Sequence, residues 1–251
     1  MARWRAVKRW AAAWLGQSLA LAAPPPLAQL ESMIERLPRA GRLRVLEAGC
    51  GSLPIQIGLP ADAHLVGIDT SQRQLDRNVQ VDDKVLGDIC THVFDEPFDV
   101  VSCWDVLEHL PRPELALANL ARATRPGGLI VLKVPNVMSL KGLATKLTPH
   151  RSHVWVYRRV YGYEHAGQAD QGPFRTYLRR SISKRGLLRF ARQHGLVVEL
   201  VARYESEHQA RLRRRLRVDG TVWRGMVRFV RVASLGQLEL DGTELVVLLR
   251  K

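Results

Sequence analysis

The sequence predicts an α/β fold. We expect a doubly wound sheet of seven mostly parallel strands with helices on both faces, a helical segment before it and a cap inserted after the fifth strand. Short apolar runs of strand length alternate with segments of helical periodicity. Acidic or glycine residues directly follow the first three runs, at the position where ligands bind in open α/β sheets. No apolar stretch of about 18 residues is uninterrupted, so we predict no spanning helix.

Seven segments have the length and apolar character of strands, and the first three lie close together. In chain order, the predicted strands are Arg44–Glu47, His64–Asp69, Lys84–Gly87, Phe98–Cys103, Leu129–Val134, Val197–Tyr204 and Glu244–Leu249. The predicted helices are Leu27–Leu37, Ser71–Asn78, Pro113–Ala123 and Ser183–His194, with a turn at Arg125–Gly128. Parallel strands joined by helices require right-handed crossovers, which give the doubly wound arrangement.

Residues 1–26 contain a basic stretch, an apolar stretch over Trp10–Ala23 and then Pro24–Pro26, an order that secretory signals share. Polar or small residues interrupt the apolar stretch at positions 16–18. Apolar residues recur at helical spacing at Trp4, Val7, Ala11, Trp14 and Leu21. We therefore favour an amphipathic helix that packs on the domain or lies on a membrane surface, and keep a signal peptide as the alternative.

The net charge is +14 and the sequence pI is about 10.5. Arginines and lysines gather in residues 3–9 and again in residues 211–231. Such an excess attracts polyanions or anionic membrane surfaces, although a solvated arginine-rich face explains it equally well. Cys50, Cys90 and Cys103 form no C-x-x-C pair, which argues against a disulfide framework and is typical of a reducing compartment. We expect a cytoplasmic protein, with peripheral membrane contact through its basic termini as an option.

Three elements follow successive predicted strands and together indicate a nucleotide-like ligand. The loop Glu47–Gly51 places glycines where backbone can pass close to a ligand. Asp69 ends the second strand, where a carboxylate can accept hydrogen bonds from ribose hydroxyls. After the third strand, Asp88 can accept from an adenine amino group while Ile89 packs on the ring. Each element alone is an ordinary turn, cap or surface acid, but their order and spacing make coincidence improbable.

These segments, together with Phe98–Leu110 and Arg125–Asn136, resemble class I S-adenosylmethionine-dependent methyltransferases. More closely, they are similar to the group that includes the ubiquinone-biosynthesis O-methyltransferases and many small-molecule and sugar methyltransferases. The resemblance covers residues 41–136. It implies an enzyme with a cofactor-binding core at 41–136, preceded by a helical segment at 1–40. A substrate cap at 137–180 and the remainder of the domain at 181–251 would follow.

The resemblance assigns S-adenosylmethionine as cofactor and S-adenosylhomocysteine as product. The methionine end would be held by the loop after the first strand, the ribose by Asp69 and its neighbour, the adenine by the third element, and the sulfonium side by two residues after the fourth strand. In order, these residues are Glu47, Ala48, Gly49, Cys50, Gly51, Asp69, Thr70, Gly87, Asp88, Ile89, Cys103 and Trp104. Residues 52–55 depart from the family's small-residue run, so the first helix is expected to be short or displaced.

The acceptor is expected to meet the cap. Methyl transfer from a sulfonium depends mostly on alignment, and a base matters when the acceptor is a hydroxyl. His153, His150 and His109 are the candidate bases, although the Glu108-His109 pair is also common in the family for structural reasons. Arg151, Trp155, Tyr157, Tyr163, Phe174 and Tyr177 are the candidate substrate-binding residues. The pair His150 and His153 is too small a ligand set for a metal, so we predict none.

We expect methylation of a hydroxyl on a small molecule or glycan, with a lipid-linked acceptor included, by a monomer or homodimer. A nucleic-acid methyltransferase is the alternative that the charge suggests. Base N-methyltransferases of this fold usually carry Asn/Asp-Pro-Pro-aromatic after the fourth strand, whereas this chain has Cys103–Val106 there. Cytosine-C5 enzymes place Cys beside Pro, which Cys103 lacks. A non-catalytic scaffold is the second alternative, and the intact Asp69, Asp88 and glycine loop argue against it.

Overall fold

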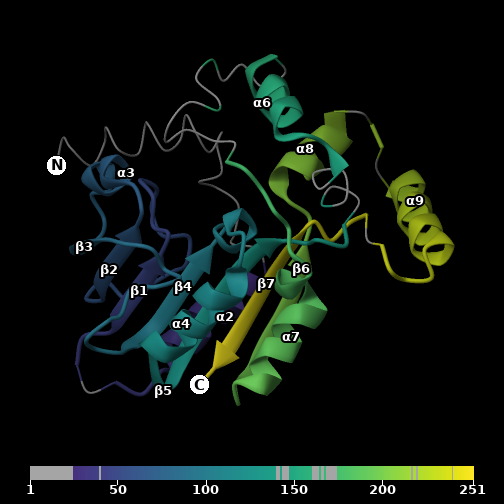
Figure 1. Ribbon diagram of the computed structural model, residues 1–251. Coiled ribbons are helices and arrows are strands. Elements are labelled where there is room, and N and C mark those ends of the chain that lie inside the picture. Colours follow the sequence, from purple (N-terminus) through teal and green to yellow (C-terminus); the bar gives the residue numbers. More distant parts are fainter. Residues whose placement is uncertain are drawn as a thin grey trace.

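The computed structural model describes residues 25–39, 41–139, 142, 147–159, 164, 167, 174–215, 217–218, 220–238 and 240–251. Its seven strands form one sheet in the order β3-β2-β1-β4-β5-β7-β6. They are β1 Arg44–Ala48, β2 His64–Asp69, β3 Asp83–Leu86, β4 Phe98–Trp104, β5 Thr124–Pro135, β6 Val197–Tyr204 and β7 Glu244–Arg250. Only β7 runs antiparallel to its neighbours, β5 and β6. The seven-stranded, mostly parallel sheet that the sequence predicts is confirmed (Figure 1).

Some helices pack on the two faces of this sheet, and others lie outside it. The helices are α2 Pro25–Glu35, α3 Gln72–Arg77, α4 Pro113–Ala123, α6 His150–Arg159, α7 Lys184–Gln193, α8 Glu207–Arg215 and α9 Gly220–Ala233, with 3-10 turns η1 Leu107–His109 and η2 Arg180–Ile182. One core joins Leu117 of α4 and Leu187 of α7 to Leu46 and its neighbours in the sheet. The other joins Leu30 and Ile34 of α2 to the opposite face of the sheet. Alternate strand residues therefore feed two separate cores, as expected for a doubly wound sheet.

The segment between β1 and β2 holds no helix, since residues 49–63 contain only turns and irregular backbone. The first helix, which we expected to be short or displaced, is therefore absent from residues 49–63. Helix α2 covers part of the sheet face that the missing helix leaves exposed, and it packs in the same core as Ile57 of residues 49–63. The loop that leaves β1 is consequently not held by a following helix, and other residues must fix it.

Three parts of the chain differ from the predicted elements. The turn expected at Arg125–Gly128 lies inside β5, which runs from Thr124 with a register shift against β4 between Phe98 and Val100. The cap contains a helix, α6, rather than irregular chain alone. The arginine-rich segment between the last two strands forms α8 and α9. The expected N-terminal amphipathic helix over residues 1–23 lies outside the described residues.

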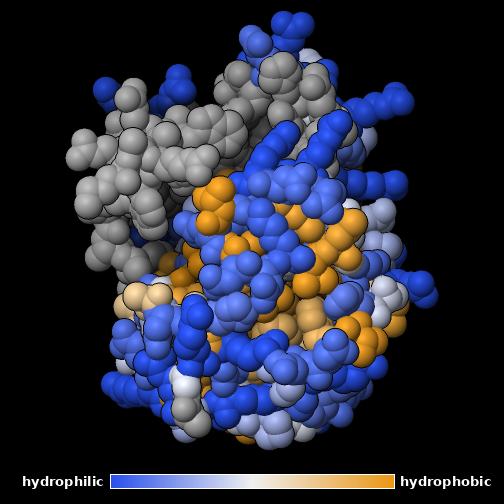
Figure 2. All heavy atoms as spheres, turned by 90° about the vertical axis from the view of Figure 1, so that its left-hand side faces the viewer, coloured by the Kyte–Doolittle hydropathy of each residue, from blue (hydrophilic) through white to orange (hydrophobic). Residues whose placement is uncertain are grey.

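The sheet edge formed by β3 is mostly polar. Figure 2 shows this side of the molecule, where separate hydrophobic groups lie among hydrophilic residues rather than forming one continuous apolar face. Val79, just before β3, and Leu86, at its end, are exposed apolar side chains. Isolated apolar side chains of this kind are normal on protein surfaces.

Candidate functional site

The loop after β1 lies at the carboxyl ends of the central strands and is held tightly from two sides. Gly49 and Gly51 have φ angles of 73° and 51°, a region that side-chain-bearing residues rarely adopt. The backbone N–H groups of Gly49 and Cys50 donate to the Ile68 carbonyl at 2.8 and 3.1 Å. A Cβ at Gly49 would lie only 2.5 Å from Val106 Cγ2. Glycine is therefore required where the loop turns between β2 and the segment after β4.

Asp69 fixes the same loop from the end of β2. Its Oδ2 accepts from the Gly51 N–H at 2.9 Å, and its Oδ1 accepts from the Ser71 N–H at 2.8 Å. The Asn78 side-chain amide donates to the Gly51 carbonyl at 3.1 Å. An ionised carboxylate has about four acceptor positions, so Asp69 can still accept from a ligand hydroxyl. Asp69 thus acts both as the support of the glycine loop and as an acceptor directed to the sheet edge.

The third sequence element reaches the same edge. The Gly87 N–H donates to the Asp69 carbonyl at 3.0 Å, which joins the end of β3 to the end of β2. Asp88 is exposed, and its Oδ1 accepts from the Cys90 N–H at 2.8 Å. Ile89 is buried in the core, and Thr70 is exposed beside Asp69. The structure therefore brings together the Glu47–Gly51 loop, Asp69 and Asp88 as the sequence predicts, with Ile89 packed mainly against protein.

Glu47 is a buried carboxylate at the end of β1. Burial raises its pKa to about 8, and its Oε2 has no hydrogen-bond partner within the described part of the chain. A buried acceptor without a partner is costly, and a cationic ligand donor would satisfy it. Cys103 is fully buried in the core, backbone included, whereas Trp104 is partly buried.

An ion cluster under the site was not predicted from the sequence. Lys133 Nζ lies 2.5 Å from Asp105 Oδ1 and 2.9 Å from Glu244 Oε2, joining β5 to β7 and to the segment after β4. Burial alone would lower the pKa of Lys133, but the Asp105 and Glu244 carboxylates raise it above its usual value. Asp105 has a φ of 55°, so this charge cluster holds an unusual backbone turn. The available signal was a lysine inside an otherwise apolar strand.

His109 follows this turn in η1. Its Nδ1 lies 2.9 Å from the Arg175 carbonyl, which can only accept, so Nδ1 carries the proton and Nε2 is left as a proton acceptor. Burial lowers the pKa of His109 and outweighs the Arg175 hydrogen bond and the Asp105 carboxylate, which raise it, while the nearby His150 lowers it slightly further. The ring packs edge-on against Phe174, with centroids 5.8 Å apart. His109 is therefore a held, mainly neutral imidazole at neutral pH.

Comparison with known proteins assigns the chain to a family. A family model described as a methyltransferase domain matches residues 18–201. The chain belongs to this methyltransferase family. The resemblance to class I S-adenosylmethionine-dependent methyltransferases is thereby confirmed, and with it the cofactor that the resemblance assigns.

Individual relatives cover only part of the chain. An uncharacterized methyltransferase of Schizosaccharomyces pombe is 32% identical over 114 residues, which are 38% of this chain and 41% of the relative. The ubiquinone biosynthesis O-methyltransferase of Hahella chejuensis is 29% identical over 145 residues, 51% of this chain and 60% of the relative. The chain thus spans about half the length of these curated relatives. A methyltransferase structure from Archaeoglobus fulgidus shares the fold, with a TM-score of 0.51 at 17% identity, covering 90% of this chain and 93% of that one.

Residues 137–180, the expected cap, are only partly described. His150 is partly buried and close enough to act electrostatically on His109, whereas Arg151 and Trp155 are exposed, the latter by 60%. Tyr177 lies between the Arg175 and Arg179 guanidinium groups at 5.2 and 5.9 Å from its ring centroid. The side chains of His153 and Tyr157, and all of Tyr163, lie outside the described residues.

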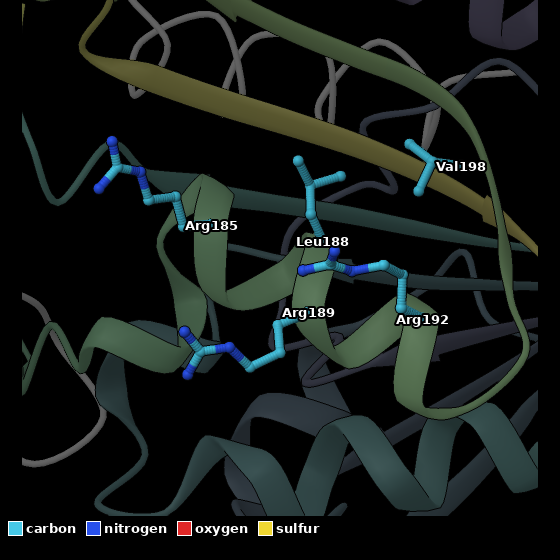
Figure 3. Close-up of a pocket in the computed structure, with 5 residues that line it drawn as sticks. All are labelled: Arg185, Leu188, Arg189, Arg192 and Val198. Atoms are coloured by element: carbon cyan, nitrogen blue, oxygen red, sulfur yellow. The ribbon is translucent and has the colours of Figure 1, made fainter.

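No group of three or more His, Cys, Asp or Glu side chains within the described ranges could hold a metal ion. A separate hollow of about 430 Å³ lies between α7 and β6, lined by Arg185, Leu188, Arg189, Arg192 and Val198 (Figure 3). β6 is four strands from β1 in the sheet, which at about 4.8 Å per strand is roughly 19 Å. This hollow is thus distinct from the edge where the methyltransferase's glycine loop and Asp69 meet.

Proposed function

We propose that this protein transfers the methyl group of S-adenosylmethionine to a hydroxyl of a small molecule or glycan, with His109 as the general base. The observation that carries the proposal is the hydrogen bond from His109 Nδ1 to the Arg175 carbonyl, which leaves Nε2 free of its proton. Family membership supports the donor, and the O-methyltransferase name of the Hahella chejuensis relative supports a hydroxyl acceptor.

The residues at the sheet edge fit such a cofactor. Glu47 Oε2 supplies a buried acceptor for a cationic group, and Asp69 supplies one for ribose hydroxyls. Gly51 is favoured in the loop by its φ of 51° and by Gln74 Oε1, which would lie 2.9 Å from an added Cβ. When bound, the cofactor supplies an electrophilic methyl group on a positively charged sulfur. The loop residues and Asp69 would hold it, and Asp88 would lie at its adenine end.

The part played by the protein in the reaction is to orient the acceptor and take its proton. The cofactor, held by the Glu47–Gly51 loop and Asp69, would supply the methyl group to the acceptor oxygen and leave as the uncharged thioether S-adenosylhomocysteine. His109 Nε2, which lies 4.0 Å from Glu108 Oε1, takes the hydroxyl proton. Phe174 is 45% exposed beside this ring and supplies an apolar wall for the acceptor.

The test uses methyl-deuterated S-adenosylmethionine with a panel of phenols, sugars and a small-molecule extract, with products followed by mass spectrometry. We expect label on oxygen. His109→Gln should lower kcat by about 10²- to 10⁴-fold, since general bases contribute that much. Because the pKa of His109 is lowered, kcat in the wild type should rise with pH through a value below 6.5 and then level. This rising limb should vanish in the variant.

His64→Gln is the matched control, because His64 begins β2, at the opposite end of that strand from Asp69, and pairs with Asp83 at 2.7 Å. It should leave kcat within about twofold, as surface changes usually do. S-adenosylhomocysteine affinity should stay unchanged in both variants. Label on nitrogen or carbon, or an unaltered kcat in His109→Gln, would reject the proposed reaction.

A further inference from the structure

Helix α9 carries a row of exposed apolar side chains. Val222, Met226 and Phe229 are 62%, 44% and 73% exposed, and their i, i+4, i+7 spacing places them along one side of the helix. Val232 and Leu235 extend the exposed apolar surface toward the end of the helix. No residue of α9 is buried. We call the first three residues the apolar row.

A second row on the same helix consists of arginines. Arg224, Arg228 and Arg231 have the same spacing and begin two residues after the apolar row, which places them about 200° around the helix. All three are exposed, and Arg231 lies 3.9 Å from Asp241. Helix α9 has no acidic residue, and residues 209–238 contain eight arginines against one aspartate. The helix therefore presents an apolar side and a strongly basic side.

The third side of α9 is attached to the domain. Trp223 packs under the Arg213 guanidinium, 5.1 Å from the ring centroid, and Arg213 is in turn held by Glu205 at 3.1 Å. Figure 1 shows α9 beyond β6, clear of the sheet and of the helices that cover it. The attachment therefore fixes the helix at the outer side of the molecule while its apolar row stays exposed.

We propose that α9 binds in the plane of an anionic lipid membrane, with the apolar row inserted and the arginine row among the lipid phosphates. An amphipathic helix with arginines on its polar face and large apolar residues on the other is the pattern of interfacial helices. Its 14 residues span about 21 Å, less than the roughly 30 Å of a bilayer core. Among the described residues, no helix is long and apolar enough to cross a membrane.

Charge and hydropathy favour this occupant over two others. A second copy packed on the apolar row would leave both arginine rows, about 200° around each helix, without an anionic partner, since the helix has no acidic residue. A nucleic acid would use the arginines but would leave the apolar row in water. An anionic bilayer satisfies both rows at once, since it offers phosphates next to hydrocarbon.

The test is cosedimentation of the full chain with vesicles of phosphatidylcholine alone or with phosphatidylglycerol. We expect binding only to the anionic vesicles. Phe229→Asp should weaken it by about tenfold, since it removes a large exposed apolar side chain that would insert into the bilayer. Arg224→Gln and Arg228→Gln should each weaken it by about fivefold. Raising salt from 0.1 to 1 M, which shortens the Debye length from about 10 to about 3 Å, should weaken binding in the wild type.

Val93→Asp is the matched control, because Val93 is 75% exposed in the connection between β3 and β4 and the charge change is the same. It should bind vesicles like the wild type, and all variants should keep their affinity for S-adenosylhomocysteine. Absence of vesicle binding overturns the proposal. So does a Phe229→Asp variant that binds normally while the arginine variants lose binding to both vesicles and single-stranded RNA. A dimer in light scattering that Phe229→Asp dissociates would instead assign α9 to a second copy.

Discussion

Charged side chains are held in place at one end of the sheet and exposed at the other. Beside β1 and β2, Asp69 is held by the Gly51 and Ser71 backbone, and Glu47 is buried. Beyond β6, the arginines of α9 face outward from a helix with no buried residue. The first arrangement positions a few polar atoms for one ligand, while the second presents charge and apolar surface over an area. The comparison suggests that the chemistry is set at one end of the sheet and the location of the protein at the other.

The Lys133 cluster lies between these ends, so disrupting it is the strongest way to break the comparison. Lys133→Met would leave Asp105 and the buried Glu244 without their shared cation. Removing one partner of a buried ion pair typically costs about 3–5 kcal/mol, and we expect a loss of that size in the free energy of unfolding. Urea denaturation followed by circular dichroism measures it.

Lys84→Met is the control for this change, since Lys84 is an exposed lysine on β3. It should alter the free energy of unfolding by no more than about 0.5 kcal/mol. If Lys133→Met costs less than about 1 kcal/mol, the cluster does not stabilise the turn at Asp105, and the two ends of the sheet are joined by apolar packing alone.

The sheet and most of its helices could be predicted because their information is local. β2 and α4 have the predicted bounds, since an apolar run or a helical period marks each one directly. α9 was not predicted as a helix because its arginines interrupt the apolar run. The segment was interpreted only as basic, and the helical spacing of its apolar row was overlooked. The extent of β5 was missed because Gly127 and Gly128 are typical turn residues, yet Gly127 donates to the Lys251 carbonyl at 2.7 Å.

The site was predictable where it follows strand ends and unpredictable where it depends on distant contacts. Asp69 and Asp88 lie together at the carboxyl ends of β2 and β3 because these strands are parallel neighbours. His109 was ranked behind the cap histidines, because its hydrogen bond to Arg175 spans 66 residues and leaves no local pattern. The same holds for Glu244, which reaches Lys133 from the last strand.

A second prediction concerns Asp69, whose effect should stay at one end of the sheet. Asp69→Ala removes the acceptor of the Gly51 and Ser71 N–H groups. Since hydrogen bonds to charged groups contribute about 1.5–3 kcal/mol, S-adenosylhomocysteine should bind about ten- to a hundredfold more weakly in titration calorimetry. Asp76→Ala, in the exposed part of α3, should leave the affinity within about twofold. Vesicle binding should not change in either variant, and a joint loss would contradict the separation of the two ends.

The smallest effect is expected from Glu47, and it appears as a pH dependence. The pKa of about 8 means that this carboxyl is mostly protonated at neutral pH in the free protein. A ligand that carries an ammonium group favours the ionised form, so binding below pH 8 must first release the proton. The affinity for S-adenosylhomocysteine should therefore rise roughly tenfold between pH 6.5 and 8 and then level. Glu47→Gln should bind with no such dependence, and if its pH profile matches the wild type, the titrating group lies elsewhere and Glu47 does not face the cationic end of the ligand.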